Sequence, residues 1–548
     1  MTLRMALLPL AVGSLVVAVV VAAARIEPVA VSTPAATPEG RAVATQANDL
    51  LRVGWRAEGL PDAAPADDLT VLRRLTLALH GTVPSLEEIR AFEADDSPER
   101  LRRWTRRTVR DDRFGRYLAE RLARPMVGTA REPFGVYRRD RLTDWLAGQL
   151  NENVPWSDTV TRLIADEGVW TDTPSVNFLT SQISQDDLDE NALAARTVRA
   201  FLGQRIDCAQ CHDHPFDKWK QDQFEGLAAC FGQSGLSIGG MMDDPKKTYE
   251  VQDRETLEMT AIDPAFPFGD DWLSAEQRQA RPRAQLAAWV THEENHRFDR
   301  AIVNRVWTLM LGRPLVPNRP VDDLPDPIDP VDRLFDDENP HAVLDLLADD
   351  FRASGRRLHR LVETIAATDA FLASTRQPDG VDSDDFDREL AEELWAVRPL
   401  VRLRPEQMIG SMLQAGSVRT IDRDSHLFVR FLRFVRENDF VNQYGDAGEA
   451  ELADRSATIP QALLRMNGKL ARELSEATPI SAAGRIAAVQ KDDAKLVETA
   501  YLVCLTRRPG EEEAAFFVDS LATADNRERA VEDLFWTLFN SPEFSWIR

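Results

Sequence analysis

Cysteine is scarce in this chain, with four in 548 residues, and that scarcity excludes a small scaffold held together by disulfides. Such scaffolds need covalent links because their cores are small, whereas hydrophobic residues make up 43% of this sequence. Two cysteines, Cys208 and Cys211, belong to one short motif. Each of the other two, Cys230 and Cys504, lies within an apolar run, and we expect both to be buried free thiols.

Basic residues are outnumbered by acidic residues. The chain has 66 Lys and Arg against 90 Asp and Glu, a formal net charge of -24. Nucleic acids and anionic lipids bind proteins through a cationic surface. The composition therefore disfavours both, and we predict no nucleic-acid partner.

Only one long apolar run is present. Residues 5–24 carry no charge and are bounded by Arg4 and Arg25. A cleavable signal peptide has an apolar region of about 7 to 15 residues before small residues, whereas a spanning helix needs about 20. Small residues end the run, but its length favours an uncleaved anchor with Arg4 in the cytoplasm. We predict a signal peptide or membrane anchor at 1–25, attaching the chain to a membrane unless it is cleaved, and a flexible tether at 26–50. The remainder is then extracytoplasmic, in a periplasm-like compartment, and either membrane-tethered or secreted.

Apolar residues recur at helical spacing through most of the sequence, which predicts a mainly α fold with few strands. Steps of three and four place four leucines on one helix face: Leu69, Leu72, Leu75 and Leu79. Ser85 and Glu88 form a capping box that starts the next helix. Further helices are predicted at 140–151, 157–166, 187–202, 283–292, 298–311, 341–353, 405–414, 493–506 and 527–539.

The helical pattern breaks at 237–280, where Gly, Pro and Asp are frequent and one strand is predicted near 248–251. We therefore predict two helical domains, at 51–236 and 281–548, joined by this irregular region. Residues 314–340 are dense in Pro and Asp and cannot form a continuous helix.

The most informative motif is Cys208-Ala209-Gln210-Cys211-His212. In c-type cytochromes the two thiols of C-x-x-C-H attach the haem vinyl groups, and the adjacent histidine is the proximal iron ligand. The composition predicts about 0.0004 chance occurrences of this pattern in the chain. Attachment of haem c takes place outside the cytoplasm, which agrees with the predicted export. We therefore expect haem c on Cys208 and Cys211, with His212 on the iron.

Two other interpretations of the motif stay open. His214 follows two residues after His212, so the set Cys208, Cys211, His212 and His214 has the chemistry of a tetrahedral zinc site. Structural zinc sites normally space their ligand pairs farther apart. The two thiols could also form a structural or redox disulfide, although no thioredoxin-like βαβ pattern surrounds them.

If haem is bound, Met241 or Met242 is a candidate sixth ligand. Both lie in a Gly-rich segment about thirty residues after His212, and methionine ligation raises the reduction potential of haem. Methionines in such segments are more often packing residues.

His292 and His296 match the H-E-x-x-H spacing of zinc hydrolases. No third ligand is evident, and a new helix is predicted to start just after the pair. We interpret the pair as a helix junction. The sequence contains no Walker or dinucleotide-binding motif.

Taken together, several blocks resemble planctomycete cytochrome-c-like exported proteins, which carry domain of unknown function 1549 followed by domain of unknown function 1553. The first domain is suggested by residues 73–84, 144–155 and 201–219, the last of which include the cysteine motif, and the second by 301–313, 459–468 and 540–544. The resemblance implies export, a cytochrome-like role for Cys208, Cys211 and His212, and no established reaction. It also implies membership of an exported system, often beside a co-encoded sulfatase-like protein. Relatives usually have Asn-Pro where this chain has Asn295-His296.

The leading hypothesis is a mono-haem redox or electron-transfer partner in an extracytoplasmic system. The alternative is a non-haem structural or binding component that uses the Cys/His cluster for zinc or to stabilise a turn. A hydrolase centred on the same histidines is a third hypothesis. Catalytic residues are not identified by the sequence, and whether the chain is an enzyme stays open.

Overall fold

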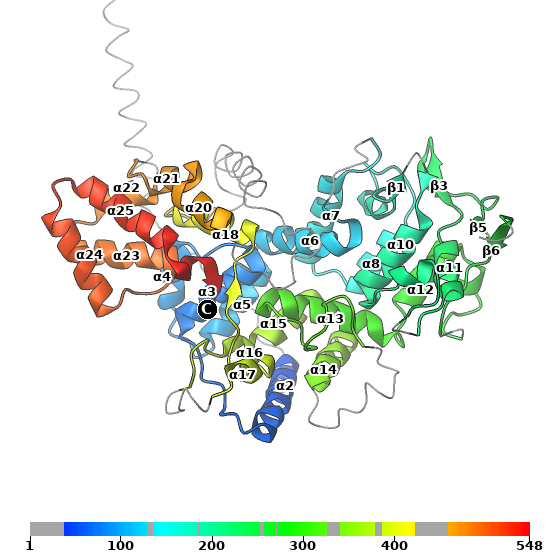
Figure 1. The fold of residues 1–548 in the computed structure, drawn as a ribbon, viewed down its shortest axis with the longest axis horizontal. Coiled ribbons are helices and arrows are strands. Elements are labelled where there is room, and N and C mark those ends of the chain that lie inside the picture. Colours follow the sequence, from blue (N-terminus) through cyan, green and yellow to red (C-terminus); the bar gives the residue numbers. More distant parts are fainter. Residues whose placement is uncertain are drawn as a thin grey trace, which may run out of the picture. The chain divides into compact units, whose positions relative to one another are not determined.

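The computed structural model describes residues 38–129, 135–184, 187–215, 218–252, 257–269, 271–325, 340–378, 386–421, 459–479 and 481–547. Within these ranges the fold is mainly helical with a few short strands, which confirms the predicted class (Figure 1). No helix in them is both long enough and apolar enough to span a bilayer. The predicted signal or anchor at 1–25 lies outside the described residues.

The first half of the chain forms short helices joined by tight turns. The α-helices are α2 (Pro38–Ala57), α3 (Asp68–His80), α4 (Leu86–Glu93), α5 (Arg100–Val109), α6 (Asp112–Val127), α7 (Arg139–Asn151), α8 (Trp156–Ala165), α9 (Asn177–Thr180), α10 (Glu190–Thr197) and α11 (Gln221–Ala229). Short 3-10 helices occur at Pro174–Val176 and Asp207–Gln210, and a π-helical segment occurs at Val198–Leu202.

The second half is also helical. Its α-helices are α12 (Pro282–Val290), α13 (His296–Leu311), α14 (Pro340–Ala353), α15 (Leu358–Ala366), α16 (Asp369–Leu372), α17 (Arg388–Glu393), α18 (Pro405–Ala415), α20 (Ile459–Asn467), α21 (Lys469–Ser475), α22 (Ala482–Val489), α23 (Asp493–Leu505), α24 (Glu511–Thr523) and α25 (Arg527–Asn540). Two 3-10 helices are Gln277–Gln279 and Pro542–Ser545. The helices predicted at 140–151, 157–166, 283–292, 298–311, 341–353, 405–414, 493–506 and 527–539 are confirmed, with ends that shift by no more than two residues.

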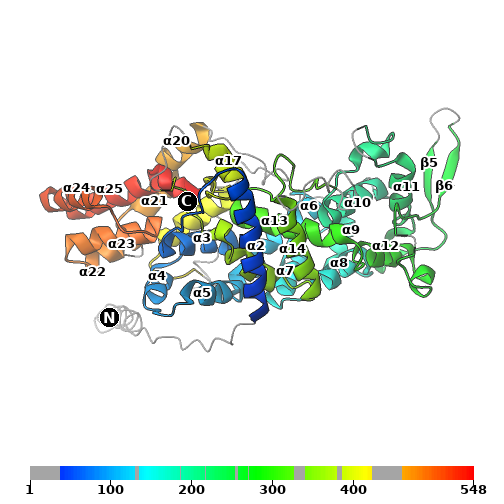
Figure 2. The ribbon, with the colours of Figure 1, turned by 90° about the horizontal axis from the view of Figure 1, so that it is seen from below.

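The described strands form two-stranded antiparallel pairs. These are β1 (Ile183–Ser184) with β2 (Asp187–Leu188), β3 (Ser234–Ser237) with β4 (Gly240–Asp243), β5 (Tyr249–Gln252) with β6 (Met259–Ile262), and β7 (Val401–Arg402) with β8 (Trp546–Ile547). Strand β5 confirms the strand predicted near 248–251. The β5–β6 hairpin stands beside α11 (Figure 2). The helix predicted at 187–202 begins only at Glu190, because Asp187 and Leu188 pair with β1 and Asp189 caps α10.

Helix α3 lies at the junction of the buried clusters. Val71 and Leu75 belong to the largest cluster, Leu77 to a second and Leu72 to a third. The face that carries Arg73 and Arg74 is buried as well. Because a helix that is buried on all sides has no solvent-facing stripe, α3 is an interior helix around which the rest of the body packs.

Buried arginines satisfy carbonyl groups at helix ends. Arg398 is 0% exposed, and its Nη2 donates to the Met310 carbonyl near the end of α13 at 2.8 Å. Arg74 Nη1 donates to the carbonyls of Phe371 and Ala373 at the end of α16, at 3.0 and 2.7 Å. The last carbonyls of a helix lack partners within it and carry partial negative charge. These guanidinium groups therefore stabilise the helix ends to which they donate. Burial lowers the pKa of Arg398 to about 9.

The hydrophobic core continues across the region where the sequence places a domain boundary. The largest cluster runs from Ala47 in α2 to Val397, so it includes residues on both sides of 237–280. The second cluster is built mainly from residues after Leu403 and also takes Leu77 and Val83. Residues 39–548 form one compact unit. The predicted domains 51–236 and 281–548 therefore do not have separate cores.

The prediction of a flexible tether at 26–50 is wrong in its second half. Helix α2 begins at Pro38, and its residues Ala44, Ala47 and Leu51 are buried, as is Trp55 in its last turn. Trp55 Nε1 donates to the Leu394 carbonyl at 2.6 Å. A composition rich in Pro, Ala and Thr suggested a tether, but tertiary burial of one face stabilises the segment from Pro38 as a helix.

Candidate functional site

A rigid segment leads into the cysteine motif. Helix α10 continues directly into the π-helical segment Val198–Leu202, and Gly203 ends it with a left-handed backbone at φ 65°. Gly203 lies against α13, because an added Cβ would come within 3.1 Å of the Ala301 Cβ. Only glycine fits this combination of positive φ and close approach. The turn before the motif is therefore fixed by its packing on α13.

Asp322 holds the same segment from the other side. It accepts two hydrogen bonds from Arg205, from Nε at 3.1 Å and Nη2 at 2.7 Å, and it also pairs with Arg199. Asp322 is 3% exposed. Burial alone would raise its pKa, but Arg305, Arg199 and Arg205 together hold the pKa below its usual value. This ion-pair network anchors the chain on both sides of Gly203.

The motif itself forms an exposed turn. Cys208 lies in the 3-10 helix Asp207–Gln210 and Cys211 caps it, with the Cys211 N–H donating to the Cys208 carbonyl at 3.3 Å. Both thiols are free and both residues are exposed, whereas Ala209 between them is buried. The buried Ala209 fixes the turn to the body and leaves the two thiols accessible on the surface.

The imidazole of His212 is held in one tautomer. Its Nδ1 lies 2.7 Å from the Asp213 carbonyl oxygen. A carbonyl can only accept, so Nδ1 carries the proton and Nε2 presents its lone pair. His212 is exposed. An exposed imidazole beside two free thiols is the donor set that covalent haem attachment requires, so the residues present fit the predicted group.

The residues after His212 close a short loop. The His214 N–H donates to the Trp219 carbonyl at 2.7 Å, and Asp213 Oδ1 accepts from the Gln221 N–H at the start of α11. The Trp219 ring is 3% exposed and packs on Phe268, with ring centroids 6.5 Å apart. This loop fixes the backbone of the motif relative to α11. Phe216 and Asp217 of the same block lie outside the described residues.

The four candidate zinc ligands are not assembled around one point. Among the described residues, the ligand atoms of only one group of three or more His, Cys, Asp and Glu lie within 4.8 Å of one another, and that group does not include the motif. Zinc held by Cys208, Cys211, His212 and His214 needs such convergence, because tetrahedral Zn–S and Zn–N bonds are only about 2.0 to 2.3 Å long. Zinc binding would therefore require the turn to rearrange.

The two candidate sixth ligands have different environments. Met241 is 0% exposed in β4, and its backbone exchanges two hydrogen bonds of 2.9 Å with Gly168. Met242 is 45% exposed on the other face of the β3–β4 hairpin. The Met241 side chain is therefore enclosed, whereas the Met242 side chain is accessible as a candidate iron ligand.

His292 and His296 are not on one helix. Helix α12 ends at Val290 and α13 begins at His296, so the turn between them separates the two rings. His292 stacks on Trp272 with centroids 5.2 Å apart, and His296 Nδ1 contacts Arg352. The interpretation as a helix junction is confirmed.

Cys230 and Cys504 are buried free thiols, as predicted. Burial raises the pKa of Cys230 to about 12 and raises that of Cys504 further. Neither thiol is therefore available as a thiolate near neutral pH.

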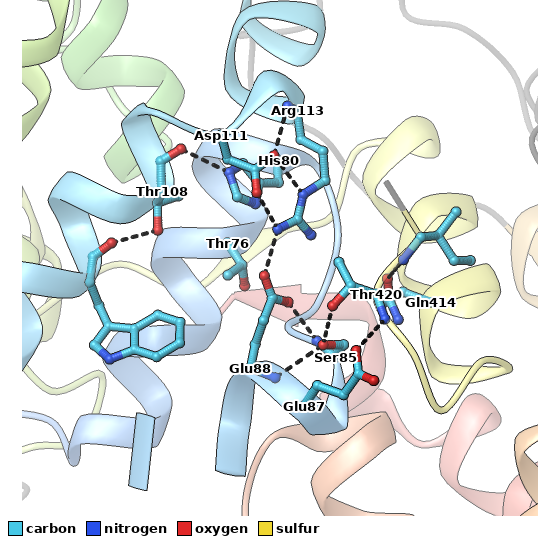
Figure 3. Close-up of polar contacts among 12 residues, drawn as sticks. Thr76, His80, Ser85, Glu87, Glu88, Thr108, Asp111, Arg113, Gln414 and Thr420 are labelled. Atoms are coloured by element: carbon cyan, nitrogen blue, oxygen red, sulfur yellow. Dashed lines mark hydrogen bonds and ion pairs between the residues drawn. The ribbon is translucent and has the colours of Figure 1, made fainter. Parts of the chain in front are cut away.

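A second polar cluster was not predicted from the sequence. His80 at the end of α3, Glu88 in α4 and Asp111 before α6 converge on Arg113 (Figure 3). Burial lowers the pKa of His80 to about 4, assisted by Arg113. The sequence analysis identified Glu88 only as a capping residue and His80 only as a member of the block 73–84. The cluster could not be predicted because the packing of three helices brings its residues together.

Two family models match the chain. Residues 46–235 match the family PSCyt2, described as a protein of unknown function (DUF1549), and residues 282–427 match PSD1, described as a protein of unknown function (DUF1553). The two domains occur in the predicted order. No curated protein and no solved structure matches the chain. The chain therefore carries two domains whose descriptions assign no reaction.

Proposed function

We propose that this chain is an exported c-type haem protein that acts as a redox or electron-transfer partner in an extracytoplasmic system. One haem would be attached to Cys208 and Cys211, with His212 as the proximal ligand. A haem bound in this way supplies one-electron chemistry. Export, and attachment to a membrane through residues 1–25, belong to the same proposal, as does a partner protein that exchanges electrons with the chain.

The observation that carries the proposal is the arrangement of the three donor groups. Two free, exposed thiols lie one short turn apart, and the adjacent imidazole already donates its Nδ1 proton to the Asp213 carbonyl. A carbonyl partner on one ring nitrogen orients the other nitrogen and strengthens it as a ligand. The chain's own contribution is to present the thiols and to fix the imidazole plane.

The supporting residues keep this arrangement rigid. Gly203 packs against α13, and Asp322 ties Arg199 and Arg205 to the base of the turn. A rigid surround limits the structural change that accompanies electron transfer, and the charges near the site tune its potential. The exposed position of the motif would leave part of a haem accessible to a partner.

The test is to produce the chain in a bacterial host that attaches haem c and to record a pyridine haemochrome spectrum with zinc analysis of the same sample. We expect one covalent haem per chain, and none in the double variant Cys208→Ala/Cys211→Ala. The matched control, Cys230→Ala/Cys504→Ala, removes the two buried thiols and should retain the haem.

The alternative function is a structural or binding component with zinc on Cys208, Cys211, His212 and His214. The donor chemistry of these four residues favours it, and the lack of convergence of their ligand atoms counts against it. Absence of covalent haem together with one zinc per chain would establish this alternative and overturn the haem proposal.

A further inference from the structure

Three metal-ligating side chains converge inside the helical body, outside the cysteine motif. One ligand atom each from His80, Glu88 and Asp111 lies within 4.8 Å of the others. We propose that these three residues bind a divalent metal ion such as Zn²⁺. The inference is independent of haem, because none of the three residues belongs to the cysteine motif.

The imidazole of His80 presents an unused lone pair. Its Nε2 lies 3.0 Å from the Thr108 carbonyl oxygen and therefore carries the proton. Its Nδ1 has no hydrogen-bond partner in the part of the chain that the structure describes, although His80 is only 4% exposed. A buried polar atom without a partner carries a free-energy cost, because it has lost its hydrogen bonds to water. A metal ion on Nδ1 would remove this cost, and the Thr108 carbonyl would fix the tautomer as second-shell groups do in metal sites.

The two carboxylates retain capacity for a further ligand. Glu88 accepts from the Ser85 N–H at 2.9 Å and from Arg113 Nη2 at 2.5 Å. Asp111 accepts from the Arg113 N–H, Nε and Nη2 at 2.9, 3.0 and 2.8 Å. These five hydrogen bonds use about five of roughly eight lone-pair sites on two carboxylates. The oxygens are thus held in place by donors while lone pairs remain for an ion.

The charge balance also favours a cation. Glu88 and Asp111 contribute two negative charges, and Arg113 supplies one positive charge that bridges them (Figure 3). With His80 neutral, the side chains of these four residues together carry one net negative charge. A divalent ion is attracted by this excess. The Asp111 side chain is 28% exposed, so the ion can reach the cluster from solvent.

The framework of the site is rigid and its donor set suits zinc. His80 ends α3, Glu88 lies in the first turn of α4, and Asp111 caps the N-terminus of α6. Imidazole nitrogen and carboxylate oxygen are both zinc donors, and three protein ligands leave a fourth tetrahedral position for water. Because the ion would join three helices, binding should raise the thermal stability of the chain.

The experiment uses the full chain with Cys208→Ala/Cys211→Ala, so that the cysteine motif cannot hold metal. This parent is titrated with Zn²⁺ alone by isothermal calorimetry, and its Tm is measured with and without Zn²⁺. We expect one equivalent to bind and the Tm to rise. His80→Gln should weaken binding at least tenfold and abolish the Tm rise.

A matched control is His359→Gln. His359 is also buried and also bonds a carbonyl through Nε2, but among the described residues it does not belong to a cluster of metal-ligating side chains. It should bind Zn²⁺ as the parent does. Failure of the parent to bind, or equal binding by His80→Gln, would overturn the metal site. If His80→Gln does not fold, Asp111→Asn gives the same test. Because the motif cysteines are absent throughout, neither outcome affects the haem proposal.

Discussion

Glu406 offers a direct test of how buried arginines stabilise this body. Its carboxylate, in the first turn of α18, lies 2.6 Å from Arg124 Nη2 and 3.3 Å from Arg121, both in α6. Burial alone would raise its pKa, but Arg121 and Arg124 hold the pKa at about 2. A change from 4.5 to about 2 corresponds to about 3 kcal/mol, since one pKa unit is worth about 1.4 kcal/mol. Glu406→Gln should therefore lower the free energy of unfolding by about 3 kcal/mol at pH 7.

The sign of the pH dependence follows from the depressed pKa. The folded protein binds the proton less tightly than the unfolded chain, so the stabilisation is complete above pH 4.5 and is lost as the pH falls toward 2. Urea unfolding of both proteins at pH 7, 5 and 4 should show a gap that narrows with acid. Glu512→Gln, an exposed control, should change stability by less than about 0.5 kcal/mol. A gap below about 1 kcal/mol at pH 7, or one independent of pH, would refute the reasoning.

Three further predictions concern other parts of the body. Burial lowers the pKa of His359 from 6.5 to about 4. The contribution of neutral His359 to the free energy of unfolding should therefore fall as the pH drops from 6.5 toward 4. His359→Gln should remove this pH dependence from a plot of unfolding free energy against pH. Arg398→Met leaves helix-end carbonyls without donors and should lower the Tm, with a loss of about 2 to 4 kcal/mol in urea unfolding. Gly240 has a φ of 98°, and a Cβ at this position would meet the Gly168 backbone. Gly240→Ala should therefore lower the free energy of unfolding by about 1 to 3 kcal/mol. Faster amide exchange in the β3–β4 hairpin is the readout.

The sequence predicts helices well and their surroundings poorly. The spacing of Leu72, Leu75 and Leu79 correctly places a helix there, because periodicity is a local property. It does not show that Arg73 and Arg74 on the remaining surface are buried too. A charged arginine is expected to be exposed to solvent. Arg73 and Arg74 can be buried because they donate to carbonyl groups that are distant in the sequence.

In α2 the sequence analysis predicted a tether where the structure has a helix. Its composition suggested a linker, and its helix depends on burial of Trp55 against residues more than three hundred positions away. Such contacts leave no local pattern. The shared core of the two family domains could not be predicted for the same reason. Residues on each side of 237–280 contact one another in one cluster, and such contacts leave no local pattern in the sequence.

For the candidate site, the sequence predicts the chemistry but not the geometry. The spacing of Cys208, Cys211 and His212 is a local motif, and the exposed turn agrees with it. The Asp322 network and the tautomer of His212 depend on tertiary contacts and could not be predicted. The same holds for His80, whose carboxylate neighbours come from other helices.

The most direct test of the central claim is the intact mass of the full chain purified from a host that attaches haem c. We expect a mass increase of one haem that survives denaturation and disappears in Cys208→Ala/Cys211→Ala. An unmodified mass from a host that attaches haem to a known c-type cytochrome in parallel would contradict it.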